Sequence, residues 1–142
     1  MSNTNTSEAI DMGVAKENIS HGQIISTSMY KEVSLVFFEK ENSIGVAYVN
    51  EKNEWVRNEP LFAFEDDLAV SDIIVHLEVD ETTIIPILLG IVRDDSIGKV
   101  EIKNLNDDSM DEVWVRSNTD SLFFHYSLPN KNIIYKLQTT ER

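Results

Sequence analysis

The sequence predicts a mainly β protein, an antiparallel sandwich or rolled sheet of about ten short strands with one short N-terminal helix. First, apolar and polar residues alternate over short stretches through most of the chain, which is typical of half-buried strands. Second, polar turn signals separate these stretches about every 8–12 residues. Third, 142 residues with a 42% apolar share are enough for one domain with its own core.

The N-terminal segment is polar. Residues 1–7 are expected to form a flexible leader, because Ser-Asn-Thr-Asn-Thr-Ser offers nothing to a core. A single β-rich domain is expected over residues 8–142. Residues 8–16 are predicted to form a short helix with Ser7 as its cap, although Gly13 disfavours it.

The first strands form a predicted hairpin. Residues 33–38 and 44–49 are apolar on both faces, and the polar segment 39–43 between them reads as a turn. A second polar turn at 51–54 leads into a strand that starts at Trp55. Residues 59–70 fit either a short acidic helix or a strand and a loop, and we favour the strand and loop.

The second half of the chain repeats the strand pattern, with expected strands at residues 73–79, 83–93, 99–104, 113–116, 122–128 and 133–137. Pro86 indicates an edge position or a bulge, because proline cannot donate to a sheet ladder. A turn at Pro129 and Asn130 is predicted to join the last two strands. Residues 34–38 and 121–124 are alike, which indicates either a weak internal duplication or two similar hairpins.

The chain is strongly acidic. Twelve basic residues face 25 acidic ones, for a formal net charge of -13, and residues 58–92 contain no Lys or Arg. Such a surface repels phosphate backbones and anionic lipids, so ordinary nucleic-acid binding is not expected. The charge fits a basic partner, a site for cations, or solubility alone.

The absence of cysteine excludes disulfides, thiolate catalysis and cysteine-ligated metals. The longest apolar run, residues 83–92, is about half of what a membrane span needs. The sequence as given carries no signal peptide. These features leave the compartment open.

No nucleotide-binding, nucleophile or zinc-protease motif occurs, and no catalytic, cofactor-binding or metal-ligating residue is assigned. His21, His76 and His125 stand alone in the sequence, and a structural or surface role is expected for each. The best cation candidate is the acidic loop that holds Asp107, Asp108, Asp111 and Glu112, since calcium prefers several oxygen ligands from one loop. That loop lacks the EF-hand spacing, so a solvated turn is favoured over a cation site. Asp94-Asp95 is similar and shorter.

The two tryptophans are candidates for binding. Trp114 alternates with Val113 and Val115, so its side chain is expected on the other face of the strand. That face is either a second packing layer or an exposed patch. Trp55 ends the first hairpin region, and both residues are worth testing for binding.

A resemblance follows from two stretches. The similarity covers residues 36–48 up to Trp55, followed by residues 89–97 (Leu-Gly-Ile-Val-Arg-Asp-Asp-Ser-Ile) and 100–102 (Val-Glu-Ile). These stretches resemble small uncharacterised exported or lipid-anchored β proteins of Bacillus-type bacteria. The resemblance implies an extracellular or cell-surface location, with the cytoplasm as the alternative. It carries no activity to any residue. Here the signal segment and the lipid-modifiable Cys are absent.

Three function classes remain. The leading expectation is a non-enzymatic, exported or surface-tethered domain that binds a protein or an envelope component. The alternative is an intracellular acidic inhibitor that imitates nucleic acid, which fits the base-free stretch. A third class, a carboxylate- or calcium-dependent enzyme, has no positive signal.

Overall fold

A computed structural model describes residues 3–41, 43–63, 69–94, 96–114, 116–117, 122–127 and 135–141. The protein is mainly β, with 62% of the chain in strands, antiparallel sheets and one helix, which confirms the predicted fold class. The chain divides into two compact units, residues 1–64 and 65–142, and each is described by itself. The expectation of one continuous domain over residues 8–142 stays a prediction.

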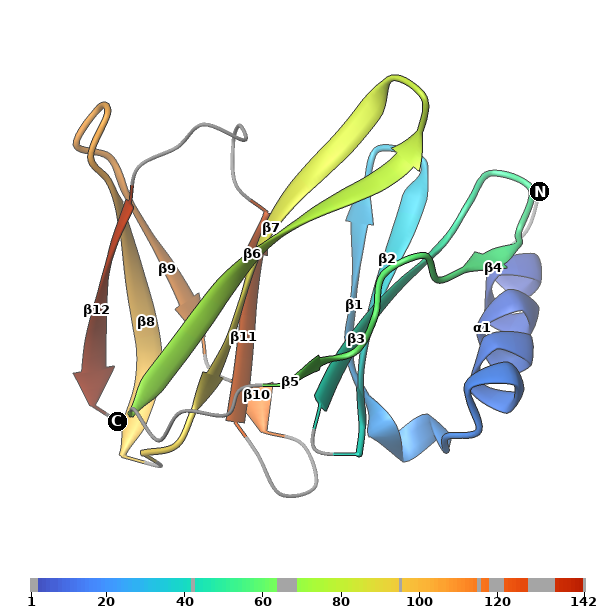
Figure 1. The fold of residues 1–142 in the computed structure, drawn as a ribbon, viewed down its shortest axis with the longest axis horizontal. Coiled ribbons are helices and arrows are strands. Elements are labelled where there is room, and N and C mark those ends of the chain that lie inside the picture. The colour runs from blue at the N-terminus through green and yellow to red at the C-terminus, as the bar shows by residue number, and fades with distance from the viewer. Residues whose placement is uncertain are drawn as a thin grey trace. The chain divides into compact units, whose positions relative to one another are not determined.

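The first unit is a five-stranded antiparallel sheet with one helix (Figure 1). The strands run in the order β1-β2-β3-β4, and β5 also pairs with β3. The elements are α1 (Asn3–Glu17), the 3-10 turn η1 (His21–Gln23), β1 (Ile24–Tyr30), β2 (Val33–Lys40), β3 (Ser43–Val49), β4 (Trp55–Val56) and β5 (Phe62–Ala63). The predicted hairpin is therefore present as β2 and β3.

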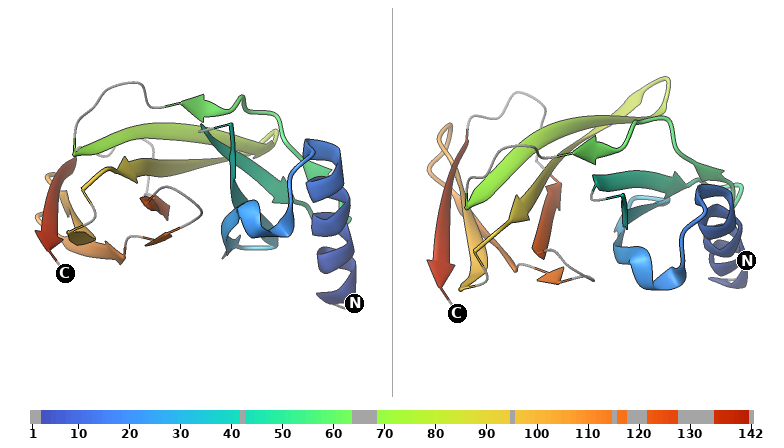
Figure 2. Two further views of the ribbon diagram at one scale, coloured as in Figure 1. Left: turned by 90° about the horizontal axis from the view of Figure 1, so that it is seen from below. Right: turned by 60° about the horizontal axis from the view of Figure 1, so that its bottom comes forward.

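Helix α1 is longer than the sequence predicted. It begins at Asn3, so residues 3–7 are helical rather than a flexible leader, and Ser7 is inside the helix and not its cap. Ala9, Gly13 and Glu17 are buried and recur every four residues, which places them on one face of the helix. This face packs on β3 and β4, as Figures 1 and 2 show. Packing explains why a polar, glycine-containing segment is helical.

Two rings lie where that face meets the sheet. Phe38 of β2 pairs in register with Gly45 of β3, and a Cβ at Gly45 would come within 2.2 Å of the phenyl ring. The Phe38 ring is 6.1 Å from that of Trp55 between centroids, tilted by 41°. The Trp55 ring in turn reaches Gly13 of the helix. Glycines thus admit the aromatic side chains that join helix and sheet.

Strand β1 was not predicted from the sequence. Its residues Ile24–Tyr30 include Ser26, Thr27 and Ser28, so apolar alternation is weak. In the structure β1 pairs with β2 and lies at the end of the strand order. An edge strand that is partly exposed needs little apolar pattern, which is why periodicity did not reveal it.

The second unit holds two sheets. Its strands are β6 (Val70–Asp80), β7 (Thr83–Val92), β8 (Ile97–Asn104), β9 (Met110–Trp114), β10 (Arg116–Ser117), β11 (Leu122–Ser127) and β12 (Tyr135–Glu141). One sheet has the order β10-β11-β7-β6 and the other β12-β8-β9. Leu88, Val92 and Phe124 of the first sheet form one core with Ile97, Val100 and Ile102 of the second. This unit is therefore a β sandwich.

Gly90 and Phe124 repeat the arrangement seen in the first unit. They pair in register between β7 and β11, and a Cβ at Gly90 would come within 2.1 Å of the phenyl ring. Phe124 lies almost fully inside the core of the sandwich.

Three sequence predictions need correction or completion. The described strands β11 and β12 do not pair with each other, because β11 pairs with β7 while β12 pairs with β8. The expected turn at Pro129 and Asn130 lies outside the described residues. The likeness of 121–124 to 34–38 stays a prediction. Pro86 is in register with His76 of β6, and the described pairing of β7 with β11 begins only at Ile87. Pro86 thus sits where the described β7–β11 ladder ends. Within residues 59–70, β5 and the start of β6 agree with a strand, and residues 64–68 lie outside the described part.

Candidate functional site

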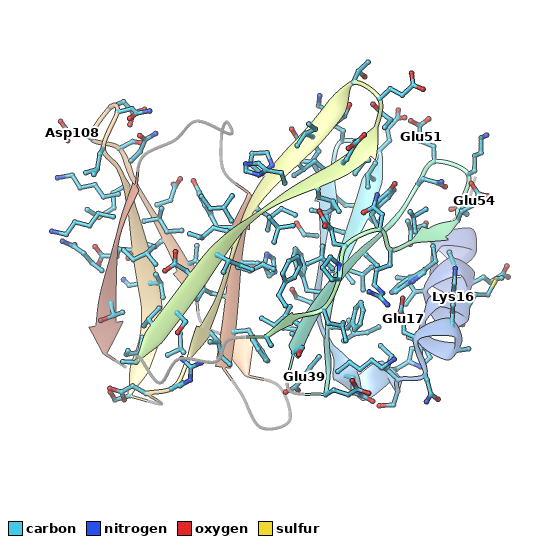
Figure 3. The ribbon with its side chains drawn as sticks, viewed as in Figure 1. Lys16, Glu17, Glu39, Glu51, Glu54 and Asp108 are labelled. Atoms are coloured by element: carbon cyan, nitrogen blue, oxygen red, sulfur yellow. The ribbon has the colours of Figure 1, made fainter. Side chains whose placement is uncertain are left out.

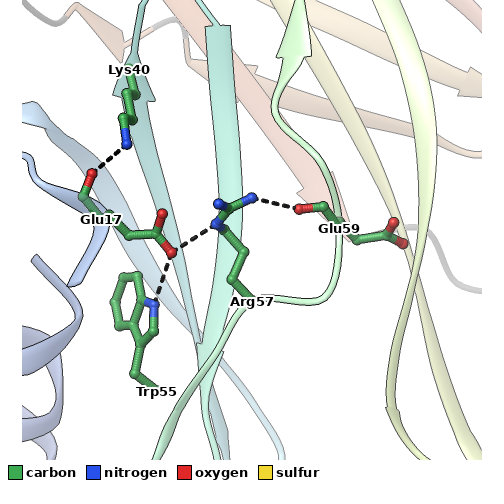
Figure 4. Close-up of polar contacts among 5 residues, drawn as sticks. All are labelled: Glu17, Lys40, Trp55, Arg57 and Glu59. Carbon is green, nitrogen blue, oxygen red and sulfur yellow. Dashed lines mark hydrogen bonds and ion pairs between the residues drawn. The ribbon is translucent and has the colours of Figure 1, made fainter.

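Glu17, the last residue of α1, joins the helix to the sheet. Its side chain is only 6% exposed. One carboxylate oxygen accepts hydrogen bonds from Nε of Arg57 at 2.7 Å and from the indole Nε1 of Trp55 at 3.3 Å (Figure 4). Arg57 also donates to the backbone oxygen of Glu59 at 2.9 Å. The buried charge is therefore paired by donors from β4 and the segment after it.

Helix α1 also ends at Glu17. Asn18 adopts the left-handed conformation with φ 59°, which commonly terminates a helix. Nζ of Lys40 donates to the backbone oxygen of Glu17 at 2.5 Å, and a cation at this end also suits the helix dipole. Burial raises the pKa of Glu17, but the hydrogen bonds from Arg57 and Trp55 and the charges of Arg57 and Lys40 outweigh it. The pKa of Glu17 is consequently below its usual value.

The turn before β4 is organised by Asn50. Its side-chain oxygen accepts the backbone N–H groups of Lys52 and Glu54, and its amide nitrogen donates to the Glu54 carboxylate at 3.0 Å. Thr6 of α1 donates to the Asn53 side chain at 3.3 Å, which ties the turn to the helix. The turn is thus held rigid on one side of α1.

A groove of about 360 Å³ lies between α1 and this turn. It is lined by Ala9, Met12, Lys16, Asn53, Glu54 and Trp55. Met12 is 71% exposed, an unusual position for a long apolar side chain. Lys16 and Glu54, labelled in Figure 3, bring opposite charges to the rim.

The groove combines apolar surface with charged groups. Its volume is at the lower end of the roughly 300–1,000 Å³ of ligand pockets. The indole and the thioether supply apolar surface, and a methionine side chain adapts to differently shaped partners. The Glu54 carboxylate is held in place by Asn50 before any partner arrives, so less entropy is lost on binding.

The two tryptophans named from the sequence lie in different compact units. Trp55 is half-buried, packs on the helix and also lines the groove. The backbone of Trp114 pairs with Lys99 at the end of β9, and its side chain and Val115 lie outside what the structure describes. Only Trp55 is therefore placed at a groove.

The predicted acidic loop is a turn only in part: Asp107 and Asp108 lie in the turn between β8 and β9, whereas Asp111 and Glu112 lie on β9. Each of these four carboxylates has a partner. Asp107 accepts the backbone N–H of Ser109 at 2.9 Å, and Asp108 lies 3.9 Å from Nζ of Lys103. Asp111 accepts the hydroxyl of Tyr126, and Glu112 pairs with Lys99. Within the described ranges, no three His, Cys, Asp or Glu side chains gather in a way that could hold a metal ion.

Contacts of this kind shift further pKa values. Burial, followed by the hydrogen bond to Asp111, raises the pKa of Tyr126 to about 12. The hydrogen bond to Glu112 raises the pKa of Lys99. Asp94 resembles Asp107, since both accept bonds from the serine two residues later, and these bonds lower the pKa of each carboxyl group. Asp95 lies outside the described residues.

The three histidines serve no common site in the described part of the chain. Nε2 of His21 lies 2.6 Å from the Asp11 carboxylate, and both side chains are exposed. His76 is exposed on β6, and His125 is half-buried on β11. A structural or surface role stays the prediction for each.

Comparisons with protein-family models, curated proteins and solved structures gave no match. The resemblance to exported Bacillus-type proteins therefore stays a prediction. Among the helical residues that the structure describes, no helix has both the length and the apolarity to cross a membrane.

Sequence reasoning missed Met12 and Lys16 as groove residues. Both lie in the segment predicted as a short helix, but their relation to Trp55 depends on a long-range contact. The available signal was Gly13, which was read only as a weakness of the helix. A glycine in the middle of a helix also marks a close approach by another side chain.

Proposed function

We propose that this protein is a non-enzymatic binding domain, exported or surface-tethered, that captures another protein or an envelope component at the groove between α1 and β4. The observation that carries the proposal is Met12, exposed beside the half-buried Trp55. Aromatic and methionine side chains are enriched where proteins bind one another.

The charged residues at the rim of the groove indicate the chemistry of the expected partner. Lys16 lies on one wall and the Glu54 carboxylate, held by Asn50, on the other. A segment that places an apolar side chain between two groups of opposite charge would complement both walls. A peptide segment fits this description better than an anionic lipid surface, which the net charge of -13 would repel.

The test is a photoreactive amino acid placed at residue 12 of the full chain in the source cells. Cross-linking from position 12, and none from position 110, would support the groove; Met110 is also an exposed methionine but lies on β9. The captured partner is then purified and its affinity measured. Met12→Glu should weaken binding by about tenfold or more, whereas Met110→Glu should not. Equal affinities for both variants would reject the groove.

The acidic inhibitor remains the alternative prediction. It requires competition with DNA for a basic protein, with a strong dependence on salt concentration. If a partner cross-linked from position 12 is displaced by DNA, the inhibitor reading replaces the envelope-binding one.

A further inference from the structure

Strand β1 presents an edge that differs from the others. Among the described residues it pairs only with β2, and the register shifts between Ile24 and Ser26. After this shift, residues 27–30 pair regularly with residues 33–36 of β2. An edge strand directs part of its backbone N–H and C=O groups away from the sheet, where another strand can bind them.

The composition of β1 does not protect this edge. Proteins block strand addition with charged residues, proline or very short edge strands. Within the described ranges, β1 is the one edge strand longer than two residues that contains no charged residue and no proline. The other long edge strands carry charges: Asp72, Glu78 and Asp80 on β6, Asp111 and Glu112 on β9, and Lys136 and Glu141 on β12.

A small groove adjoins this edge. It measures about 170 Å³ and is lined by Thr6 and Ile10 of α1 together with Thr27, Ser28, Met29 and Ser34 of the sheet. Thr27 is exposed and Met29 is 67% exposed. Side chains opposite each other on neighbouring strands lie on the same face. Thr27 and Met29 lie two residues apart on one face of β1 and both line the groove. A strand added beside β1 would therefore place every second side chain on that face, next to the groove.

We propose that the β1 edge, residues 27–30, binds an extended segment of a partner protein by strand addition, with one aliphatic side chain of that segment in the groove beside Ile10. The groove is too small for the roughly 300–1,000 Å³ of a drug-sized ligand, but it suits a single side chain. Backbone hydrogen bonds would supply affinity and the groove specificity.

The charge argues against a second copy of this chain as the occupant. Two chains that each carry a formal charge of -13 repel one another, whereas an extended segment that is neutral or basic does not. The β1 edge is separate from the groove at Met12, since the two grooves share no lining residue.

The test uses the full chain to select binders from a library of random peptides of about nine residues, followed by affinity measurement with the best labelled peptide. Thr27→Lys adds a charge to the edge at an exposed position and should weaken binding by about tenfold or more. Thr139→Lys, at an exposed position of the charged strand β12, is the matched control and should bind as the wild type does. Met12→Glu should also leave peptide binding unchanged.

Two further readouts identify strand addition. Amide exchange at residues 27–30 should slow when the peptide binds. A peptide N-methylated at alternate residues should bind in one phase of methylation and fail in the other, because only one set of N–H groups faces the edge. Met29→Lys serves as the second variant if Thr27→Lys has an altered melting temperature.

The proposal is overturned if no peptide is enriched or if Thr27→Lys binds the peptide as tightly as the wild type. It is also overturned if sedimentation shows a wild-type dimer that Thr27→Lys converts to monomer, since a second copy would then cover the edge.

Discussion

The indole ring of Trp55 lies against the backbone of Gly13. A Cβ added at Gly13 would come within 2.0 Å of the ring, far inside van der Waals contact. The ring has little freedom to retreat, because its nitrogen is bonded to Glu17 and Phe38 lies beside it. The absence of a side chain at one helix position thus sets how closely helix and sheet approach.

Gly13→Ala is expected to destabilise the protein. Alanine stabilises a helix by about 1 kcal/mol relative to glycine, whereas overpacking destabilises a protein by about 1–3 kcal/mol. Because the Trp55 ring is held in place, the overpacking cost is expected to exceed the gain in helix propensity. Urea unfolding followed by tryptophan fluorescence measures the change. Gly22→Ala is the matched control, since the nearest atom to its Cβ is 3.7 Å away. A Gly13→Ala protein as stable as the Gly22→Ala protein would contradict the packing.

Glu17 should make stability depend on pH. Its pKa is lowered in the folded protein from 4.5, so its contribution is present above the unfolded value and is lost as pH falls through the folded one. Glu17→Gln should therefore lower the unfolding free energy by about 1–2 kcal/mol near neutral pH. The gap from the wild type should close in acid.

Urea unfolding at a series of pH values checks this dependence. Glu8→Gln, an exposed position of the same helix, should follow the wild type throughout. If the Glu17→Gln difference persisted unchanged in acid, the charge of Glu17 would not be its cause.

The hydroxyl of Tyr126 should lose its proton at a higher pH than an ordinary tyrosine does. Its pKa is raised from 10.0 to about 12, so the protonated hydroxyl is favoured in the folded state. The free energy that this raised pKa contributes to folding is present below the pKa of the unfolded chain. It is lost as pH rises through the pKa of Tyr126 in the folded protein. The difference in tyrosinate absorbance between the wild type and Tyr126→Phe should give this pKa. Asp111→Asn should lower it only in part, because burial is the larger cause.

Calcium should not stabilise the hairpin of β8 and β9. Asp107, Asp108, Asp111 and Glu112 each already have a protein partner. Ligands that bind only the folded state raise the melting temperature, so a thermal melt with and without calcium is a sufficient measurement. A rise in melting temperature that Asp107→Asn abolishes would restore the acidic loop as a cation site.

Several of the strands that the sequence predicted are those whose burial requires an apolar pattern. Residues of β2, β3, β7 and β8 are buried on one or both faces, and their periodicity reflects it. Strand β1 was not predicted because it is an edge strand rich in hydroxyl residues. The pairing of β12 with β8 could not be predicted from the sequence of β12. Alternation of apolar and polar residues indicates which side chains share a face of a strand, but not which strand lies beside it.

The candidate site was predictable only in part. Trp55 was named from its size, but its groove needs Met12 and Lys16 from a helix that contacts it across a long sequence separation. Glu17 fell just beyond the predicted helix. Its carboxylate is unfavourable at a helix C-terminus, and this cost is offset by Arg57, which the sequence places 40 residues away.

The two phenylalanine–glycine pairs, Phe38 with Gly45 and Phe124 with Gly90, carry a consequence for how this sequence can diverge. Each ring occupies the space that a side chain on the opposite glycine would need. A larger residue at position 45 or 90 is therefore tolerable only when the facing phenylalanine becomes smaller. Homologous chains should show paired exchange at 38 with 45 and at 124 with 90, and the two pairs should vary independently of each other.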